Sequence, residues 1–150
     1  MLFSRKNVLG TIDAKTQRDV FDALAKQAVR LGVGSDAEAI ASDYAERERE
    51  ASTGFGGGIA IPHSKTDDVS DPTVLSARLS HPVEWNAIDG QPVDTVISIL
   101  VPNGANSEHL RLLSSLSRKL VHPDFVDILK NGSDDEVYTA INEVLTGPTS

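Results

Sequence analysis

Hydrophobic residues near the start of the chain recur at intervals of three and four, which places them on one face of a helix. Residues 13–31 show this pattern, and Gly32 and Gly34 predict its end. Ser35 followed by Glu38 has the spacing of a capping box, which predicts the start of a second helix. Two helices are therefore expected before residue 51, the second of them ending in the charged run 46–50.

Short apolar runs in the middle of the chain are typical of buried strands. Ile59-Ala60-Ile61 predicts a brief strand that Pro62 stops, because proline cannot donate to a strand ladder. The runs 74–79 and 93–101 predict two further strands, with the turn signal Asp89-Gly90 between them. The centre of the chain is thus expected to form a sheet.

Helical spacing returns in the last third of the chain. Ser107 predicts the N-cap of a helix that runs to about residue 121, and a short helix over 123–129 follows. Ser133 with Glu136 predicts a capping box that opens a last helix. Residues 146–150 are expected to be a frayed tail or the start of a linker.

The order of these elements predicts an α/β fold with an α+β-like arrangement. Two helices, several strands and three helices imply a small sheet covered by helices. The chain has 150 residues, which suits one compact domain over residues 1–150 with a sizeable core. Only 5% of the residues are aromatic, so the core is expected to be aliphatic. The pattern leaves the order and the direction of the strands open.

Charge and cysteine content exclude several classes of function. The formal net charge of −8 disfavours binding to nucleic acid or to an anionic membrane, since both need basic residues. The absence of cysteine excludes disulfides and thiolate metal sites. The longest strongly apolar run, 96–101, is far too short to span a bilayer, and the first ten residues lack a signal peptide's apolar stretch. We expect a cytoplasmic protein.

Four glycines in the five positions 54–58 are the most unusual feature of the chain. Glycine is costly in conformational entropy, so such a run indicates unusual backbone angles or a close approach of the backbone to another group. The run precedes a strand and lacks a following Gly-Lys-Ser/Thr, so it matches neither a dinucleotide fingerprint nor a nucleotide-phosphate loop. A flexible hairpin loop is the alternative.

Three side chains near this run are candidates for chemistry. His63 follows Pro62 at the end of a short strand, which predicts a rigidly aimed ring at a sheet edge. His109 is expected in the first turn of a helix, where backbone amides and the helix dipole favour an anion. Arg47 comes just before the glycine run. Taken singly, each has a structural alternative: a structural or core histidine, or a solvated arginine.

Together these residues resemble a known family. Its motif is matched by Arg47-Glu48, by Thr53-Gly54 after four intervening residues, by Gly58-Ile-Ala-Ile-Pro-His63, and by His109 opening a helix. The chain resembles the enzyme IIA domains of the bacterial sugar phosphotransferase system, in the fructose, mannitol and nitrogen-regulatory group. The resemblance extends over about residues 11–145. It implies the enzyme IIA mannitol/fructose-type fold, with a small mixed sheet flanked by helices on both sides.

The resemblance also implies roles for individual residues. His63 matches the phosphorylated histidine, His109 the second active-site histidine, and Arg47 an arginine that neutralises phosphoryl charge. The pocket is matched by a further set of residues: Thr53, Gly54, Gly58 and, with a mild departure from the small residue of many members, Ser64, whose hydroxyl is placed to reach the phosphate. Two other histidines match no family site and are expected on the surface: His81 and His122.

The activity implied is that of a phosphotransferase that forms a phosphohistidine. His63 would accept a phosphoryl group from the histidine phosphocarrier protein and donate it to an enzyme IIB, which serves the membrane enzyme IIC. A neutral imidazole is a good nucleophile, and Arg47, the second imidazole and the glycine-loop amides would stabilise the transferring group. We expect no cofactor and no metal.

Two alternatives remain. The nitrogen-regulatory branch signals phosphorylation state without sugar transport, but Pro72, residues 36–40 and the stretch from Trp85 to Val93 look more like the fructose branch. The alternative from a different class is a hydrolase or a structural metal site with His63, His109 and Asp67 or Asp68 as metal ligands. The sugar and the oligomeric state are left open, as is fusion to further domains.

Overall fold

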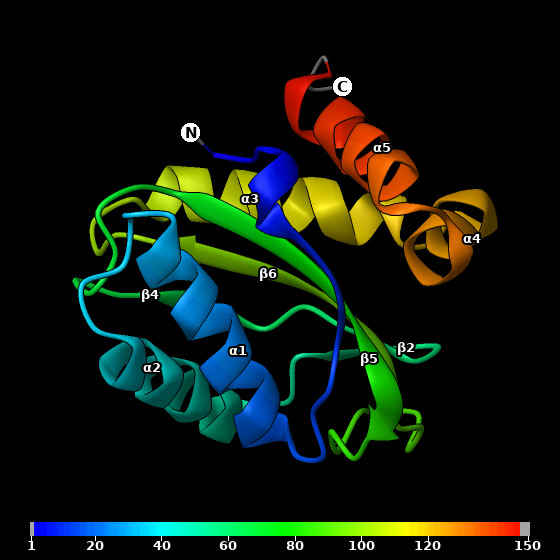
Figure 1. The fold of residues 1–150 in the computed structure, drawn as a ribbon, viewed down its shortest axis with the longest axis horizontal. Helices are drawn as coiled ribbons and strands as arrows, with labels where there is room; N and C mark the ends of the chain where they lie inside the picture. The colour runs from blue at the N-terminus through cyan, green and yellow to red at the C-terminus, as the bar shows by residue number, and fades with distance from the viewer. Residues whose placement is uncertain (1, 148–150) are drawn as a thin grey trace.

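A six-stranded sheet runs through the middle of the computed structural model, which describes residues 2–147 (Figure 1). The two longest strands, β5 (Thr73–Val83) and β6 (Val93–Val101), pair antiparallel in its centre. β1 (Val8–Ile12) lies parallel to β5 and forms one edge of the sheet. The predicted pair of long strands is therefore confirmed.

Three short strands complete the sheet beyond β6. β3 (Ile59–Ala60) and β4 (His63–Lys65) follow one another along β6, and both are parallel to it. β2 (Gly54–Gly56) pairs antiparallel with β3. The sheet is therefore mixed, and β4 has β6 as its one strand partner among residues 2–147.

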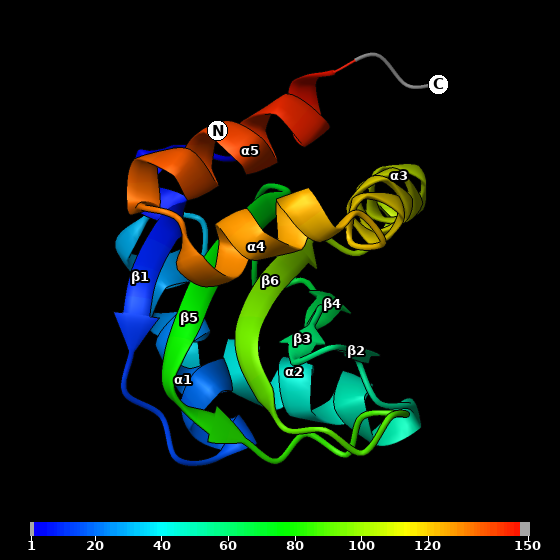
Figure 2. The same ribbon diagram turned by 90° about the vertical axis from the view of Figure 1, so that its right-hand side faces the viewer.

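Helices cover both faces of the sheet, as Figure 2 shows. α1 (Gln17–Arg30) and α2 (Ala37–Glu50) lie on one face. α3 (Asn106–Lys119), α4 (Pro123–Asn131) and α5 (Asp134–Thr146) lie on the other. The predicted α/β architecture, a small mixed sheet with helices on both sides, is confirmed. Within residues 2–147, every helix is too short or too polar to traverse a lipid bilayer.

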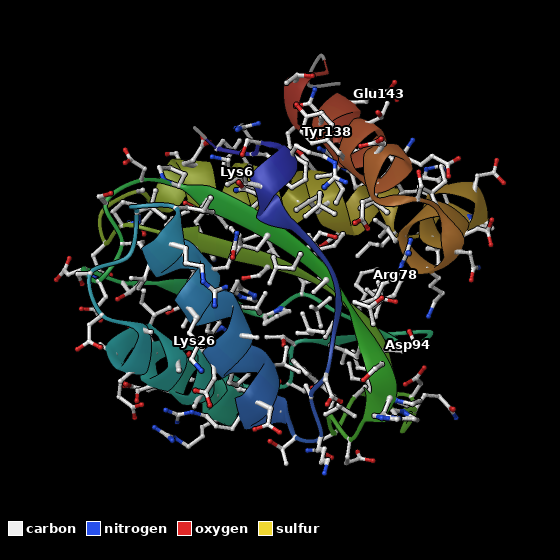
Figure 3. The ribbon with its side chains drawn as sticks, in the orientation of Figure 1. Lys6, Lys26, Arg78, Asp94, Tyr138 and Glu143 are labelled. Carbon is white, nitrogen blue, oxygen red and sulfur yellow. The ribbon has the colours of Figure 1, made fainter. Side chains whose placement is uncertain are left out.

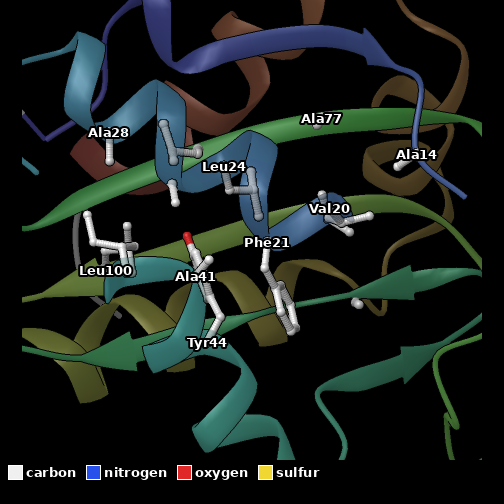
Figure 4. Close-up of a cluster of buried hydrophobic side chains, with 14 of the residues drawn as sticks. Ala14, Val20, Phe21, Leu24, Ala28, Ala41, Tyr44, Ala77 and Leu100 are labelled. Carbon is white, nitrogen blue, oxygen red and sulfur yellow. The ribbon is translucent and has the colours of Figure 1, made fainter. Parts of the chain in front are cut away.

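Alternation along β6 divides the core in two. Val96 and Leu100 belong to the cluster under α1 and α2, whereas Ile97 and Ile99 belong to the cluster under the other three helices. Figure 4 shows the first cluster, where Tyr44 and its neighbours on the helices meet the sheet. Because both of its faces are covered, β6 is buried almost throughout and can anchor elements on either side.

The N-terminal caps differ in part from those predicted. Asp36, not Ser35, caps α2, and its carboxylate accepts the amide N–H of Glu38 at 3.0 Å. Aspartate is as good an N-cap as serine, so the pattern could not separate two adjacent candidates. Likewise Ala105, not Ser107, is the N-cap of α3, and no side chain caps that helix.

The last helix begins as predicted. Ser133 and Glu136 form the expected capping box at the start of α5. The helix extends through Thr146, one residue into the predicted tail. Gly147 is the C-cap, and the last three residues of that tail, 148–150, lie outside the described residues.

Three strands escape the sequence pattern: β1, β4, and β2, which lies within the glycine run expected to be a loop. β1 is short, and Gly10 within it has a φ of 75° where its register with β5 shifts. β4 begins immediately after Pro62, although proline was expected to end the strand. The proline carbonyl accepts the amide N–H of Ile99 at 3.1 Å, so pairing with β6 passes through the proline and resumes at His63.

Arg78 on β5 ties α4 to the sheet (Figure 3). Its guanidinium donates to the carbonyl of Leu129 at 2.7 Å, to that of Ile128 at 3.1 Å, and to that of Gly132. These are carbonyls at the C-terminal end of a helix, where intrahelical partners run out and a positive charge is favourable. A cation projecting from a strand thus completes the end of a helix.

We predict that Arg78→Met destabilises the protein by about 2 kcal/mol, because several half-buried carbonyls lose a charged donor. Urea denaturation followed by circular dichroism measures the change. Arg30→Met, at an exposed position at the end of α1, is the matched control and should change stability by less than about 0.5 kcal/mol. Equal stabilities of the two variants would contradict this prediction.

Candidate functional site

Two buried histidine rings lie side by side at the edge of the sheet. His63 opens β4, and His109 lies in the first turn of α3. Their ring centroids are 5.2 Å apart, and the ring planes meet at 46°. The rings are brought together because β4 and α3 both pack on β6. Residues 46 positions apart in the sequence thereby share one site.

The hydrogen bond at Nδ1 fixes the protonation of the His63 ring. Nδ1 lies 2.7 Å from the main-chain carbonyl oxygen of Ile61. A carbonyl oxygen can only accept, so Nδ1 carries the proton and Nε2 carries the lone pair. The neutral ring therefore has a defined nucleophilic nitrogen.

The second ring has an unsatisfied nitrogen. Nδ1 of His109 is the one buried side-chain nitrogen or oxygen without a hydrogen-bond partner in the described part of the chain. Native proteins satisfy nearly all such atoms, and an exception is expected at a site that takes a ligand. His109 is only 8% exposed and its ring adjoins that of His63, so the unsatisfied nitrogen belongs to the ring next to His63.

Burial keeps both rings neutral. It is the main cause that lowers the pKa of His63, with help from the charge of Arg47, whereas the bond to Ile61 and the charge of Glu50 oppose the shift. Burial, followed by the charges of His63, Lys65 and Arg47, lowers the pKa of His109 to about 4. Near neutral pH each ring therefore has an unprotonated nitrogen.

Arg47 supplies a positive charge next to the rings. It lies in the last turn of α2, is half-buried, and donates from its guanidinium to the carbonyl of Ala51 at 3.0 Å. Its charge lowers the pKa of both histidines, which places it within electrostatic reach of both. Arg47 also lines a cavity with Ser64 and Lys65, the two residues that follow His63 on β4.

Lys65 is a second cation at the site, and the sequence analysis missed it. Its Nζ donates to the side chain of Asn106 at 3.0 Å, at the start of α3, and its charge lowers the pKa of His109. Strand alternation could have revealed it, because residues two apart on a strand point to the same side. Lys65 stands two positions after His63.

Ser64 and the two cations border one cavity. Ser64 is buried, at 6% exposure, and pairs in register with Leu100 of β6. The cavity has a volume of about 180 Å³ and is lined by residues of α2 and β4: Asp43, Glu46, Arg47, Glu50, Ser64 and Lys65. On the helix side of the cavity, Arg47 is therefore flanked by three acidic residues, Asp43, Glu46 and Glu50.

The amides at the start of the glycine loop are already engaged within the protein. The N–H of Thr53 donates to Glu48 at 2.7 Å, that of Gly54 to the hydroxyl of Ser52 at 3.1 Å, and that of Gly57 to Asp89 at 2.9 Å. The loop amides were expected to bind an anion. These three are not free to do so in this structure, because each already donates to a side chain of the protein.

Close packing explains why two positions of the loop, Gly54 and Gly58, are glycine. A Cβ on Gly54 would lie 2.5 Å from that of Ala87, so two segments can touch there because one lacks a side chain. Gly58 has a φ of 84°, and a Cβ there would lie 2.8 Å from Nζ of Lys130. That lysine pairs with Asp94 at 2.7 Å. Both glycines thus serve close packing of the hairpin.

The remaining sequence candidates lie apart from this arrangement. His81 and His122 are exposed, as expected. The possible metal ligand Asp68 has its carboxylate 3.2 Å from the hydroxyl of Thr66. Within residues 2–147, no group of three histidine, cysteine or acidic side chains is placed to hold a metal ion. The arrangement that stands out is the imidazole pair with its two cations.

Known proteins are similar to this chain in sequence and in fold. Residues 1–144 match the model of the family described as the phosphoenolpyruvate-dependent sugar phosphotransferase system, EIIA 2. A fructose-specific EIIA component from Haloferax volcanii is 40% identical over 131 residues, which cover 87% of this chain and 85% of that protein. A nitrogen regulatory protein from Pseudomonas aeruginosa is 34% identical over 140 residues, covering 93% and 91%. The chain belongs to the EIIA 2 family of this phosphotransferase system.

Solved structures agree with this assignment. The nitrogen regulatory protein IIA-Ntr from Neisseria meningitidis superimposes with a TM-score of 0.87 at 27% identity, covering 93% of this chain and 96% of that one. The IIA protein in a complex of mannitol enzyme IIA with phosphorylated enzyme IIB from Escherichia coli superimposes with a TM-score of 0.76 at 23% identity, covering 93% and 96%. The predicted enzyme IIA fold is therefore confirmed, and both the fructose and the nitrogen-regulatory branches are among the relatives.

We predict that the ring protons of His109 titrate with a midpoint of about 4 in NMR spectra, and those of His63 below 6.5. Because folding lowers the pKa of His109, the unfolded chain binds more protons between about pH 4 and 6.5, and acidification through this window costs stability. The free energy of unfolding should therefore fall less between pH 7 and 4.5 in His109→Asn than in the wild type. A His109 midpoint at or above 6.5 would contradict the prediction.

Proposed function

We propose that the chain is a phosphoryl carrier that accepts a phosphoryl group on Nε2 of His63. The observation that supports this most directly is the pair of neutral rings: one offers a lone pair at Nε2, and the other, His109, has a buried nitrogen without a partner. A phosphoryl group on the first ring would adjoin the second. This pairing is what a site for a transferable anion needs.

The transfer step is a displacement at phosphorus. The lone pair of Nε2 attacks, the new N–P bond forms as the bond to the donor's nitrogen breaks, and the donor's ring keeps that electron pair. The proton on Nδ1 of His63 stays in place, shared with the carbonyl of Ile61. Because one N–P bond replaces another, the step is reversible, which distinguishes a carrier from a hydrolase.

Charge stabilisation in this step is assigned to the surrounding side chains. Arg47 and Lys65 would offset the negative charge spread over the equatorial oxygens, and the imidazole of His109 would contribute a further polar contact. The hydroxyl of Ser64 borders the same cavity as the two cations. Thr53, Gly54 and Gly58 are better assigned to shaping the hairpin, since their contacts lie within the protein.

The partners we propose are the histidine phosphocarrier protein as donor and an enzyme IIB as acceptor, with the membrane enzyme IIC served by the latter. The family supports this, as does the mannitol enzyme IIA relative, which was solved in complex with its IIB. Leu110, the neighbour of His109, is 66% exposed and would extend an apolar docking surface beside the rings. We propose one carrier domain, residues 1–150, acting in the cytoplasm.

Fructose uptake is the role we favour, because the Haloferax relative is the more similar at 40% identity. A nitrogen-regulatory role is the second candidate, supported by the Pseudomonas relative and by the TM-score of 0.87 to a IIA-Ntr structure. Both roles need the same chemistry at His63, so the difference lies in which protein receives the phosphoryl group.

We predict that incubation with phosphoenolpyruvate, enzyme I and the histidine phosphocarrier protein adds one phosphoryl group to the wild type and none to His63→Ala. His109→Ala should still be phosphorylated, but should pass the group to an enzyme IIB about 10²-fold more slowly, as is typical when one transition-state contact is lost. Mass spectrometry and single-turnover kinetics measure the two effects. His81→Ala, which changes an exposed ring, is the control. A mass gain in His63→Ala would refute the assignment.

We predict, second, that a fructose enzyme IIB removes the phosphoryl group faster than mannitol or other IIB proteins do. The test is a panel of purified IIB domains mixed with the phosphorylated chain, followed by loss of phosphohistidine with time. If every IIB leaves the phosphohistidine intact, the nitrogen-regulatory role is favoured over sugar transport.

A further inference from the structure

Glu48, which stands next to Arg47 in the last turn of α2, has no role in the site described so far. Its carboxylate accepts two hydrogen bonds from one residue: the hydroxyl of Thr53 at 2.6 Å and the amide N–H of Thr53 at 2.7 Å. Each oxygen of the carboxylate takes one of these bonds. The end of the helix is thereby fastened to the start of the hairpin.

The chemistry of donors and acceptors gives the direction of the hydrogen bonds at the Thr53 hydroxyl. The indole N–H of Trp85 points at the hydroxyl of Thr53 at 3.1 Å, and an indole nitrogen can only donate. The hydroxyl therefore accepts from Trp85 and donates its own proton to the Glu48 carboxylate. Both oxygens of Glu48 thus act as acceptors. Trp85 is itself immobilised in the core, 2% exposed and edge-on to Phe21.

Main-chain hydrogen bonds connect Thr53 to the ring of His63. The carbonyl of Thr53 accepts the amide N–H of Ile61 at 3.0 Å. The carbonyl of the same isoleucine accepts Nδ1–H of His63 at 2.7 Å. Two hydrogen bonds therefore separate the clamped threonine from the ring, and both pass through the peptide units of Ile61.

We propose that Glu48 and Trp85, acting through Thr53, are positioning residues that keep the His63 ring in its Nδ1–H form, with Nε2 free. The inference rests on the proposed function, in which Nε2 is the nucleophile. Without the clamp, the carbonyl of Ile61 loses its fixed place, and the ring can put its proton on Nε2, which removes the lone pair. Glu48 thus controls which nitrogen reacts, although it does not touch the phosphoryl group.

The first test measures the tautomer in the unphosphorylated protein. Glu48→Gln keeps the shape of the side chain but replaces one acceptor oxygen with an amide NH₂, which cannot accept a hydrogen bond from Thr53. Nitrogen-15 NMR of the His63 ring should show the ratio of Nδ1–H to Nε2–H forms fall about 5-fold or more, the size expected when one hydrogen bond is weakened. Glu38→Gln, an exposed residue at the other end of α2, is the matched control and should leave the ratio unchanged.

Two further variants separate positioning from folding. Thr53→Val removes the hydroxyl at nearly constant volume and should shift the tautomer ratio as Glu48→Gln does, whereas Thr53→Ser keeps the hydroxyl and should restore it. In phosphoryl transfer, Glu48→Gln and Thr53→Val should lower the maximal rate without a matching change in the KM for the donor protein. If Glu48→Gln does not fold, the two threonine variants decide the question.

The outcomes are distinct. A tautomer ratio unchanged in Glu48→Gln and in Thr53→Val overturns the proposal, even if both variants are less stable, because the clamp would then be structural only. A shifted ratio in a protein whose wild type accepts no phosphoryl group would uphold the positioning but refute the carrier function. The ring spectra and the phosphorylation assay therefore test the two ideas separately.

Discussion

Two uncharged imidazole rings buried against each other set the conditions for the whole site. Burial is what lowers the pKa of both His63 and His109, and it does so because β4 and α3 are pressed onto the fully covered strand β6. The helices on both faces are therefore part of the chemistry. A sheet with one open face would leave at least one ring in water, with its pKa near the ordinary value.

The second helix contributes to this site in two ways from one turn. The charge of Arg47 lowers the pKa of both histidines, and Glu48, the next residue, binds Thr53 at the start of the hairpin that leads to β4. Consecutive helical residues point about 100° apart, so a single turn can serve two neighbouring segments. The end of α2 thus links the charge near His63 to the geometry of the strand that carries it.

The sequence allowed much of this to be predicted, but unevenly. Helices and long strands follow from periodicity, because that signal is local. The candidate site came from the resemblance to a family motif that includes Arg47, His63 and His109. Lys65 was missed although strand alternation places it on the same side as His63. The clamp on Thr53 was missed because it also needs Trp85, which is 32 residues away in the sequence. The run of glycines suggested an anion-binding loop, whereas Gly58 in fact makes room for an ion pair between Asp94 and Lys130. The glycine content indicated that another group comes close to the backbone, but it could not identify that group.

The partner of Nδ1 in His63 is a carbonyl of the main chain rather than a side-chain carboxylate. Every amino acid at position 61 would provide the same oxygen, so mutation of that residue cannot delete the acceptor, only move it. A neutral carbonyl also adds no negative charge next to the ring that, in the proposed function, carries an anion. Histidines oriented by aspartate or glutamate lack both advantages, so a main-chain acceptor suits a ring proposed to gain and lose a phosphoryl group repeatedly.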